Sequence, residues 1–350
     1  MWSRFFPGLG IIAALSSFGF TACRPGTRTA PSTSPDGGQN AAKAQYEIKL
    51  GHATANDAQD QTALFFGKEV ERLSSGRIKV SVFNASQLGN NDKMNKDLRS
   101  GAQEALLQPT GFATAYLPIL GVLDLPFLFP NDEVQTKVLN SDAAKPLLDA
   151  ALSANVEIVA FFGGGFKQLA TTFPVTKVED LRGRKFRVIS SPELVAQFKA
   201  FGAIGVPMAL GEVYTALQQG TVEGVENPED VVVKMKHHEA AKYFTRTNHG
   251  ALSSVILVNK RFLSSLPADL QKAVRDAGQS AANKALELYS QARKDSAAEM
   301  ARAGIQLTEL PAPELAKLKA AAEPVWDEAK KDKAKAEAIE SLTKAIAATR

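Results

Sequence analysis

Residues 46–83 read YEIKLGHATANDAQDQTALFFGKEVERLSSGRIKVSVF, and their pattern sets the fold class. Residues 46–50 and 77–83 alternate polar and apolar side chains with the period of a β-strand. Between them, residues 62–73 carry apolar side chains at helical spacing, and Ser74-Ser75-Gly76 ends that helix. A strand, a helix and a second strand in this order are typical of an α/β domain with a largely parallel sheet.

The same alternation continues along the chain. Further strands are predicted at 105–107, 157–162 and 185–189, and further helices at 92–100, 192–201 and 213–219. This second set predicts two α/β lobes, each with a mixed or mostly parallel sheet flanked by helices. We place the first lobe at 45–164 and 253–292, and the second at 165–252 and 293–350 with the C-terminal helices.

The C-terminal third is helical in pattern. Residues 267–303 are rich in Ala, Lys, Glu and Arg, lack an interior proline and end at Gly304. A helix of that length reaches about 55 Å at 1.5 Å per residue, so it can contact both lobes. Residues 313–349 are also predicted to be helical with an interruption at Pro324, and the lysine run at 330–335 is predicted to be a solvated face.

The N-terminus resembles an export signal. Arg4 precedes an apolar stretch at 9–20 that is too short to span a bilayer, so residues 1–22 are predicted to be a signal peptide. Small residues precede Cys23, the only cysteine, as in the lipobox of bacterial lipoproteins, although an ordinary cleaved signal with an incidental cysteine is the alternative. Residues 23–44 contain many Pro, Ser, Thr and Gly residues and are predicted to be a flexible tether.

Composition narrows the class of protein. The 350 residues are 45% hydrophobic and 22% charged, which is typical of a soluble globular protein. The net charge is +4, and the basic residues are spread along the chain instead of forming a stripe. We therefore expect no nucleic acid among the partners.

One stretch carries a family resemblance. Residues 212–228, EVYTALQQGTVEGVENP, resemble the signature of the solute-binding proteins of tripartite ATP-independent periplasmic (TRAP) transporters, in the dicarboxylate-binding DctP-like family. Supporting segments lie at 87–89, 123–129, 181–188 and 266–271. The resemblance covers about 46 to 346 and implies a two-lobed fold, a ligand in the cleft between the lobes and closure on binding.

The resemblance also implies a ligand site for a small carboxylate. In this family an arginine at the position of Arg187 forms a bidentate salt bridge with the ligand carboxylate, a role that suits its planar fork of donors. Asn227 occupies the amide position of the family, and Ser190 matches a lesser polar contact. Glu212 belongs to the signature, and the sequence leaves open whether a metal ion joins it to the ligand. We expect no cofactor.

Other positions depart from the family or are weaker candidates. Where many members carry a second arginine this chain has Lys167, a point charge that can still pair with a carboxylate. Leu210 replaces a frequent aromatic residue and removes a stacking surface. Gln108 and His52 match the edge of the first-lobe cleft and are candidates for selectivity, although a lone histidine is more often structural.

Competing chemistries find little support. Gly163-Gly164-Gly165 lacks the spacing of a phosphate-binding loop and is interpreted as a tight turn. His237 and His238 are adjacent, do not form the i, i+4 pair of a zinc protease and are interpreted as a solvated face. No Gly-x-Ser-x-Gly motif is present, so we predict a protein without enzymatic activity.

The prediction from sequence is an exported, periplasmic or surface-located receptor tethered through a lipid on Cys23. It would capture a small organic acid and deliver it to the membrane permease subunits of a TRAP transporter. A lipid-anchored carboxylate sensor or scaffold of the same fold is the alternative.

Overall fold

The computed structural model describes residues 44–349. The predicted signal peptide, Cys23 and nearly all of the tether therefore lie outside the described residues. The strands are β1 (Tyr46–Gly51), β2 (Ile78–Phe83), β3 (Ala105–Pro109), β4 (Val156–Thr171), β5 (Lys185–Val188), β6 (Ile204–Pro207), β7 (Gly224–Asn227), β8 (Tyr243–Asn259) and β9 (Gln306–Glu309).

The α-helices are α1 (Ala58–Leu73), α2 (Asn91–Ser100), α3 (Asp132–Leu139), α4 (Lys145–Ser153), α5 (Pro192–Ala200), α6 (Val213–Gln218), α7 (Glu229–Lys234), α8 (His237–Ala240), α9 (Lys260–Ser265), α10 (Ala268–Arg302), α11 (Ala312–Ala321), α12 (Glu323–Ala329) and α13 (Lys333–Thr349). Short 3₁₀ helices include η1 (Thr110–Ala113), η2 (Pro118–Asp124), η3 (Asp142–Ala144) and η5 (Leu210–Glu212). The strands and helices predicted from the sequence are present.

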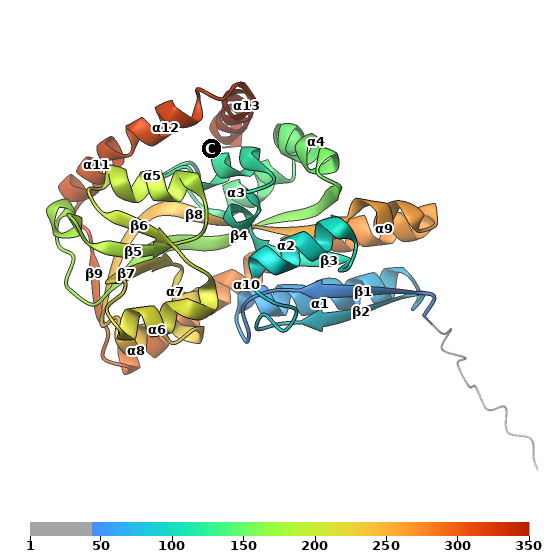
Figure 1. The fold of residues 1–350 in the computed structure, drawn as a ribbon, viewed down its shortest axis with the longest axis horizontal. Coiled ribbons are helices and arrows are strands. Elements are labelled where there is room, and N and C mark those ends of the chain that lie inside the picture. Colours follow the sequence, from blue (N-terminus) through green and yellow to red (C-terminus); the bar gives the residue numbers. More distant parts are fainter. Residues whose placement is uncertain (1–43, 350) are drawn as a thin grey trace, which may run out of the picture. The chain divides into compact units, whose positions relative to one another are not determined.

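The strands form one mixed sheet in the order β2-β1-β3-β8-β4-β7-β5-β6, with β9 paired to β8 (Figure 1). The pairs β1–β2, β1–β3, β5–β6, β5–β7 and β8–β9 are parallel. The pairs β3–β8, β4–β7 and β4–β8 are antiparallel. The predicted α/β class with mixed sheets is confirmed.

Two long central strands connect the two ends of the sheet. The C-terminal part of β8 pairs with β3, whereas its N-terminal part pairs with β9. The C-terminal part of β4 pairs with β7. We call β1, β2, β3 and the adjoining parts of β4 and β8 the first half-sheet, and β5, β6, β7, β9 and the remaining parts the second half-sheet. The division into two lobes at particular residues stays a prediction.

The sequence did not predict the full extent of these strands. The expected strand at 157–162 continues to Thr171, and β8 was not predicted. The glycines at 163–165 are part of β4 at a register shift between Gly163 and Phe166, so the expected tight turn is wrong. Gly165 has φ +85°, and a Cβ on Gly164 would lie 2.9 Å from the Leu252 carbonyl oxygen. Glycine permits this close crossing of two strands.

Buried apolar side chains pack helices against each half-sheet. Ile48 and Leu50 on β1 are fully buried and belong to one core cluster with residues of α1 and α10. In the second half-sheet, Phe186 and Val188 of β5 pack in a cluster with Phe198 of α5. Because side chains alternate along a strand, this packing directs Arg187 to the opposite face of β5.

The long helix α10 contacts elements from both half-sheets. It packs against α1, β4 and α7 (Figure 1). Alanine and glycine make up six of its eleven buried residues, which permits close approach to the strands. The expectation that this helix contacts both parts of the protein agrees with the packing.

The last helix packs differently from the expectation. Residues 293–350 were assigned to the second lobe, but α13 packs against α3, α4, η2 and η3, which were assigned to the first. The reason is the apolar face of α13, where Ala338, Ile339 and Leu342 are buried in the cluster that contains Val134 and Leu147.

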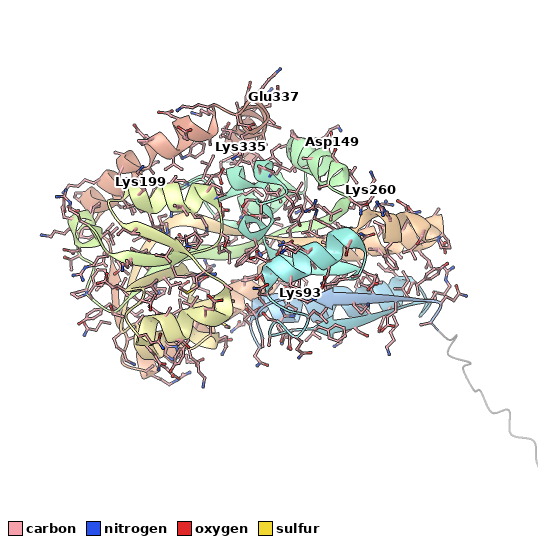
Figure 2. All side chains as sticks on the ribbon, in the orientation of Figure 1. Lys93, Asp149, Lys199, Lys260, Lys335 and Glu337 are labelled. Carbon is pink, nitrogen blue, oxygen red and sulfur yellow. The ribbon has the colours of Figure 1, made fainter. Side chains whose placement is uncertain are left out.

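Charged side chains are distributed over the described surface. Figure 2 labels Lys93, Asp149, Lys199 and Lys260, which come from four different helices. In the C-terminal lysine run Lys330, Lys331 and Lys333 are exposed as predicted, whereas half-buried Lys335 pairs with Glu193 of α5. No helix within residues 44–349 is both long and apolar enough to cross a membrane.

Candidate functional site

A cavity lies where several parallel strands end. Its walls are contributed by the segment after β1, the segment after β3, the ends of β5 and β7, and residues of η5, α7, β8 and α10. The lining residues are Ala53, Thr54, Asp57, Gln59, Pro109, Phe112, Arg187, Ile189, Leu210, Asn227, Val231, Leu252 and Tyr289. The carboxyl ends of parallel strands are the usual ligand-binding edge of an α/β sheet.

The cavity is enclosed by residues from both half-sheets. The centre of a water molecule can reach only about 20 Å³ of this cavity. That room is of the order of one water molecule. A larger ligand can enter only if the walls separate.

Arg187 supplies the positive charge in this cavity. It is 1% exposed and donates from Nε to the Met208 carbonyl oxygen at 2.9 Å, which orients the side chain. Its Nη2 is buried without a hydrogen-bond partner. Burial lowers the pKa of Arg187 to about 10, against the opposing effect of Glu226 and Glu212, so the guanidinium remains charged at neutral pH. A charged donor without a partner is costly in a protein interior, and this one lines a cavity.

Asn227 lies beside Arg187 in the cavity wall. It is the last residue of β7 and opposes Gln168 of β4 in the sheet. It is 3% exposed, and its Nδ2 also has no hydrogen-bond partner. Leu210 of η5 lines the same cavity and contributes an apolar surface. The structure thus brings together three of the residues predicted from the sequence.

The other wall carries residues that the sequence did not single out. Asp57 caps the N-terminus of α1: its Oδ1 accepts hydrogen bonds from Asp60 N at 2.8 Å and from Thr54 Oγ1 at 2.9 Å. The Gln59 side chain in turn donates to Thr54 Oγ1 at 3.0 Å. The second oxygen of Asp57, Oδ2, is buried without a partner. Burial raises the pKa of Asp57 to about 6.

The sequence contains a signal for Asp57 as a helix cap, but no signal for its position at the cavity. Aspartate just before a helical pattern is a common N-cap, which accounts for Oδ1 of Asp57. That Asp57 lines the same cavity as Arg187 and Asn227 depends on the tertiary fold. For the same reason Phe112, Tyr289 and Leu252 could not be chosen from many similar apolar residues.

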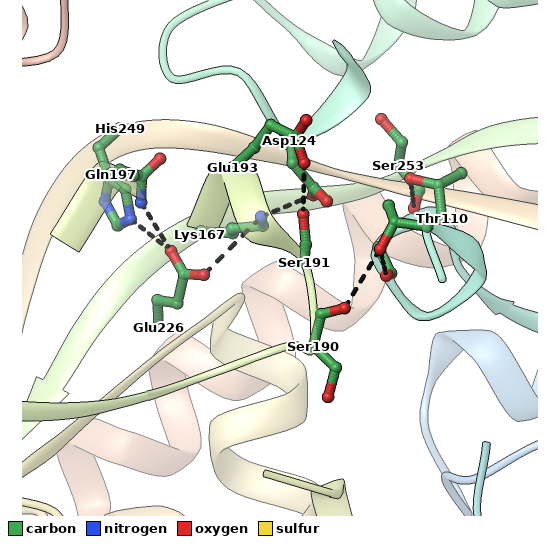
Figure 3. A network of polar contacts seen from close by, with 12 residues as sticks. Thr110, Asp124, Lys167, Ser190, Ser191, Glu193, Gln197, Glu226, His249 and Ser253 are labelled. Carbon is green, nitrogen blue, oxygen red and sulfur yellow. Dashed lines mark hydrogen bonds and ion pairs between the residues drawn. The ribbon is translucent and has the colours of Figure 1, made fainter. Parts of the chain in front are cut away.

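Lys167 lies in a different place from Arg187. It is 1% exposed on β4 and does not line the cavity. Its Nζ lies 3.2 Å from Asp124 Oδ1 and 3.9 Å from Glu226 Oε1 (Figure 3). The expected second cation for the ligand is therefore paired with carboxylates of the protein itself.

The Lys167 network extends to further buried side chains. Glu226 Oε2 lies 2.9 Å from His249 Nε2 and accepts from Gln197 Nε2 at 3.1 Å (Figure 3). His249 Nδ1 lies 2.7 Å from Thr247 Oγ1. Burial alone would raise the pKa of Glu226, but Lys167, His249 and Gln197 together hold it below its usual value. The network therefore keeps Glu226 ionised inside the second half-sheet.

The remaining predicted residues are not among the cavity-lining residues. Ser190 and Glu212 are exposed. Gln108 is buried and exchanges hydrogen bonds with Asn95, with Asn91 donating to it as well. His52 is buried with Nε2 3.1 Å from Asp60 Oδ1, which is a structural arrangement.

The histidine pair also differs from its interpretation as a solvated face. His237 of α8 is fully buried, and burial lowers its pKa to about 3, with Arg187 as the next cause. His238 is half-buried, and its Nδ1 lies 3.3 Å from the Val232 carbonyl oxygen. Between residues 44 and 349, no group of three or more His, Cys, Asp or Glu side chains is arranged to hold a metal ion.

Fold and cavity together define a class of protein: an α/β protein with a cavity between two half-sheets that are joined by long strands, a place where small molecules usually bind. Comparison with known proteins places the chain within that class. Residues 50–332 match the DctP family, described as bacterial extracellular solute-binding protein, family 7.

Individual relatives agree over most of their length. The C4-dicarboxylate-binding periplasmic protein DctP of Rhodobacter capsulatus is 33% identical over 284 residues, 80% of this chain and 85% of the relative. A TRAP periplasmic solute-binding protein of Desulfovibrio salexigens, solved with bound orotic acid, has a TM-score of 0.84 and 30% identity over 87% of this chain and all of that one. The sugar acid binding protein DctPAm of Advenella mimigardefordensis, in complex with galactonate, has a TM-score of 0.84 and 27% identity over 88% of this chain and 99% of that one.

The chain belongs to the DctP family of bacterial extracellular solute-binding proteins. The resemblance predicted from residues 212–228 is confirmed, and the protein is a solute-binding subunit of a TRAP transporter and not an enzyme. As a member of this family it is exported to the periplasm.

Proposed function

We propose that the protein captures a small carboxylate in the cavity at Arg187 and delivers it to an ion-gradient-driven permease. The observation that carries this proposal is the buried guanidinium whose Nη2 has no partner. A ligand carboxylate would accept hydrogen bonds from Arg187, and the free Nδ2 of Asn227 would donate a further bond. The exposed Ser190 and Glu212 and the buried Gln108, His52 and Lys167 would not contact the ligand in this arrangement.

The ligands named for relatives support a carboxylate. One relative is named for C4-dicarboxylates, and two solved structures contain orotic acid and galactonate. All of these molecules carry a carboxylate, while the rest of each molecule differs. The shared chemical group matches the shared need for a cationic partner, for which arginine is well suited.

Opening and closing would accompany binding. The cavity as it stands has room for about one water molecule, so its walls must separate for a ligand to enter. The walls come from both half-sheets, and β4 and β8 cross between them with a register shift at Gly163–Phe166. A hinge at this irregular crossing would let the half-sheets move while α10 stays packed along both.

We also propose that the mature protein is anchored through a lipid on Cys23 and that residues 23–44 act as its tether. The support is the sequence alone: small residues before a single cysteine, followed by a stretch rich in Pro, Ser, Thr and Gly. Replacing Cys23 with serine should release the protein from the membrane fraction of cells. Membrane retention of the Cys23→Ser protein would contradict the anchor and leave the ligand site unaffected.

The central experiment is a thermal-shift screen of the purified protein against mono- and dicarboxylates. A ligand present at 100 times its Kd should stabilise the protein by about 2.7 kcal/mol. We expect Arg187→Ala to abolish the shift. Arg184→Ala is the matched control, because Arg184 lies three residues away, is 45% exposed and pairs with Glu223 outside the cavity. Unchanged affinity in Arg187→Ala would overturn the proposed site.

A further inference from the structure

Among the residues that the structure describes, the cavity is lined by one cation and one anion. Arg187 and Asp57 both line it, and no ion pair within 4.0 Å joins them in the described residues. Each also has a buried polar atom without a partner, Nη2 of Arg187 and Oδ2 of Asp57. A ligand that fills the space between them meets a donor at one end and an acceptor at the other.

Asp57 is held rigidly on its wall. Its Oδ1 is occupied by the backbone amide of Asp60 and the hydroxyl of Thr54, and Gln59 fixes that hydroxyl in turn. These bonds occupy Oδ1 and leave Oδ2 as the free acceptor. The side chain cannot turn away from a ligand without losing the cap of α1.

Within residues 44–349, no cation other than Arg187 lines the cavity to pair with a second ligand carboxylate. Lys167, the expected candidate, is paired with Asp124 and Glu226 and does not line the cavity. The other lining residues are mostly apolar, with Phe112, Ile189 and Leu252 among them. A dicarboxylate bound at Arg187 would therefore place its other charge among apolar side chains or beside a like charge, and both are unfavourable.

From this arrangement we infer that Asp57 selects the ligand: the protein takes monocarboxylic acids whose far end carries a hydroxyl or ammonium donor, and discriminates against dicarboxylic acids. This inference rests on the proposed carboxylate site at Arg187. The donor of the ligand would bind Oδ2 of Asp57, while the carbon chain would lie against the apolar wall. The selectivity would differ from that of the relative named for C4-dicarboxylates.

The test is calorimetric titration of the full-length protein with matched acids of three to six carbons. At each length an ω-hydroxy acid, an ω-amino acid and the dicarboxylic acid are compared, for example 4-hydroxybutyrate, 4-aminobutyrate and succinate. We expect the best hydroxy or amino acid to bind at least ten-fold more tightly than the dicarboxylic acid of the same length. A dicarboxylic acid that binds as tightly as its counterparts, or more tightly, would overturn the inference and leave the carboxylate site intact.

The Asp57→Asn variant tests whether Asp57 is the residue that determines the preference among these acids. Asparagine is an equally good N-cap, so the variant keeps the bond to Asp60 N while losing the negative charge. We expect the preference for the hydroxy or amino acid over the dicarboxylic acid to fall at least ten-fold. An unchanged preference would assign it to other residues and overturn the role of Asp57. If Asp57→Asn does not fold, Asp57→Ser, which also retains a capping oxygen, takes its place.

Failure of the carboxylate site itself gives a different result. In that case no acid of the series binds, or binding persists in Arg187→Ala. Either result would overturn the proposed function together with this inference, whereas loss of selectivity alone would overturn only the inference.

Discussion

Arg187 and Lys167 are both buried cations, yet their surroundings differ. Each is 1% exposed, and both lie on strands of the second half-sheet. Lys167 has two carboxylates within 4.0 Å, those of Asp124 and Glu226, and Glu226 has further partners in His249 and Gln197. Arg187 has a carbonyl oxygen at Nε and no partner at Nη2.

At equal burial, a cation with a structural role differs from a cation that binds a ligand in whether the protein itself supplies its carboxylate partners. A buried charge must be compensated, and the compensation of Lys167 is part of the fold. Arg187 lacks a carboxylate within ion-pair distance in the described part of the chain, so its Nη2 is left to pair with a molecule in the cavity. Stability should therefore depend on Lys167 and affinity on Arg187.

The largest expected effect is on the stability of the Lys167 network. Lys167→Met removes the cation and leaves Asp124 and Glu226 buried without it. Removing one partner of a buried ion pair costs about 3–5 kcal/mol. We expect the free energy of unfolding, measured by urea denaturation, to fall by that amount.

Arg187→Met provides the contrast in the same assay. Because Arg187 has no carboxylate partner in the described residues, methionine removes an uncompensated charge and should change the unfolding free energy by less than about 1 kcal/mol. Equal urea midpoints for Lys167→Met and wild type, or a large loss in Arg187→Met, would reverse the assignment of the two cations.

A smaller effect concerns the pH dependence of stability near the anionic wall. Burial and the nearby Asp57 raise the pKa of Asp230 from 3.8 to about 7. The folded state therefore binds more protons than the unfolded state between these values, and the unfolding free energy falls as pH rises from about 4 to about 7. Asp230→Asn removes this loss and should be more stable than wild type by about 4 kcal/mol at pH 8.

The control is the same comparison in acid. At pH 4 the carboxyl of Asp230 is protonated in the folded state, so the variant and the wild type should differ little in unfolding free energy. Taking the difference between the two proteins also cancels other titrating groups such as His237, whose pKa of about 3 acts in the opposite direction. A constant difference at both pH values would show that Asp230 is ionised throughout.

The two cations also show what the sequence could and could not predict. The family resemblance of residues 181–188 and of the signature at 212–228 pointed to Arg187 and Asn227 as ligand candidates, and Leu210 was named where the family often has an aromatic residue before the signature. The pairing of Lys167 was not accessible, because Asp124 and Glu226 are 43 and 59 positions away and only the fold brings them together. Asp57 was missed for the same reason, although its capping position is visible in the sequence.

The fold shows the same limit at β8. Its first half, YFTRTNHG, contains several polar residues in a strand that is buried almost throughout. Side chains such as Thr245 and His249 are satisfied by partners from distant segments, namely Val175, Glu226 and Thr308. Hydrophobic periodicity therefore could not identify this strand, whereas the regular alternation of β1 and β2 was sufficient for theirs.

A conservative replacement separates charge from geometry at Arg187. Arg187→Lys keeps the positive charge but loses the fork of donors, including the bond from Nε to the Met208 carbonyl. We expect affinity for the best carboxylate to fall about 10- to 100-fold, equivalent to about 1.4–2.8 kcal/mol, as measured by calorimetric titration. Affinity equal to that of wild type would indicate that a point charge is sufficient and that the two cations differ only in their partners.

The smallest effect is expected for an ion pair that, unlike that of Lys167, lies largely exposed to solvent. Lys145 and Asp149 of α4 pair at 2.7 Å with side chains that are 70% and 58% exposed. Exposed pairs of this spacing contribute about 0.3–0.5 kcal/mol, because water screens the charges and both side chains lose conformational freedom. Lys145→Met should therefore lower the unfolding free energy by less than about 0.5 kcal/mol in the urea assay, and 1 M salt should remove most of that difference. A loss comparable to that of Lys167→Met would mean that the strength of these pairs is set by distance and not by burial.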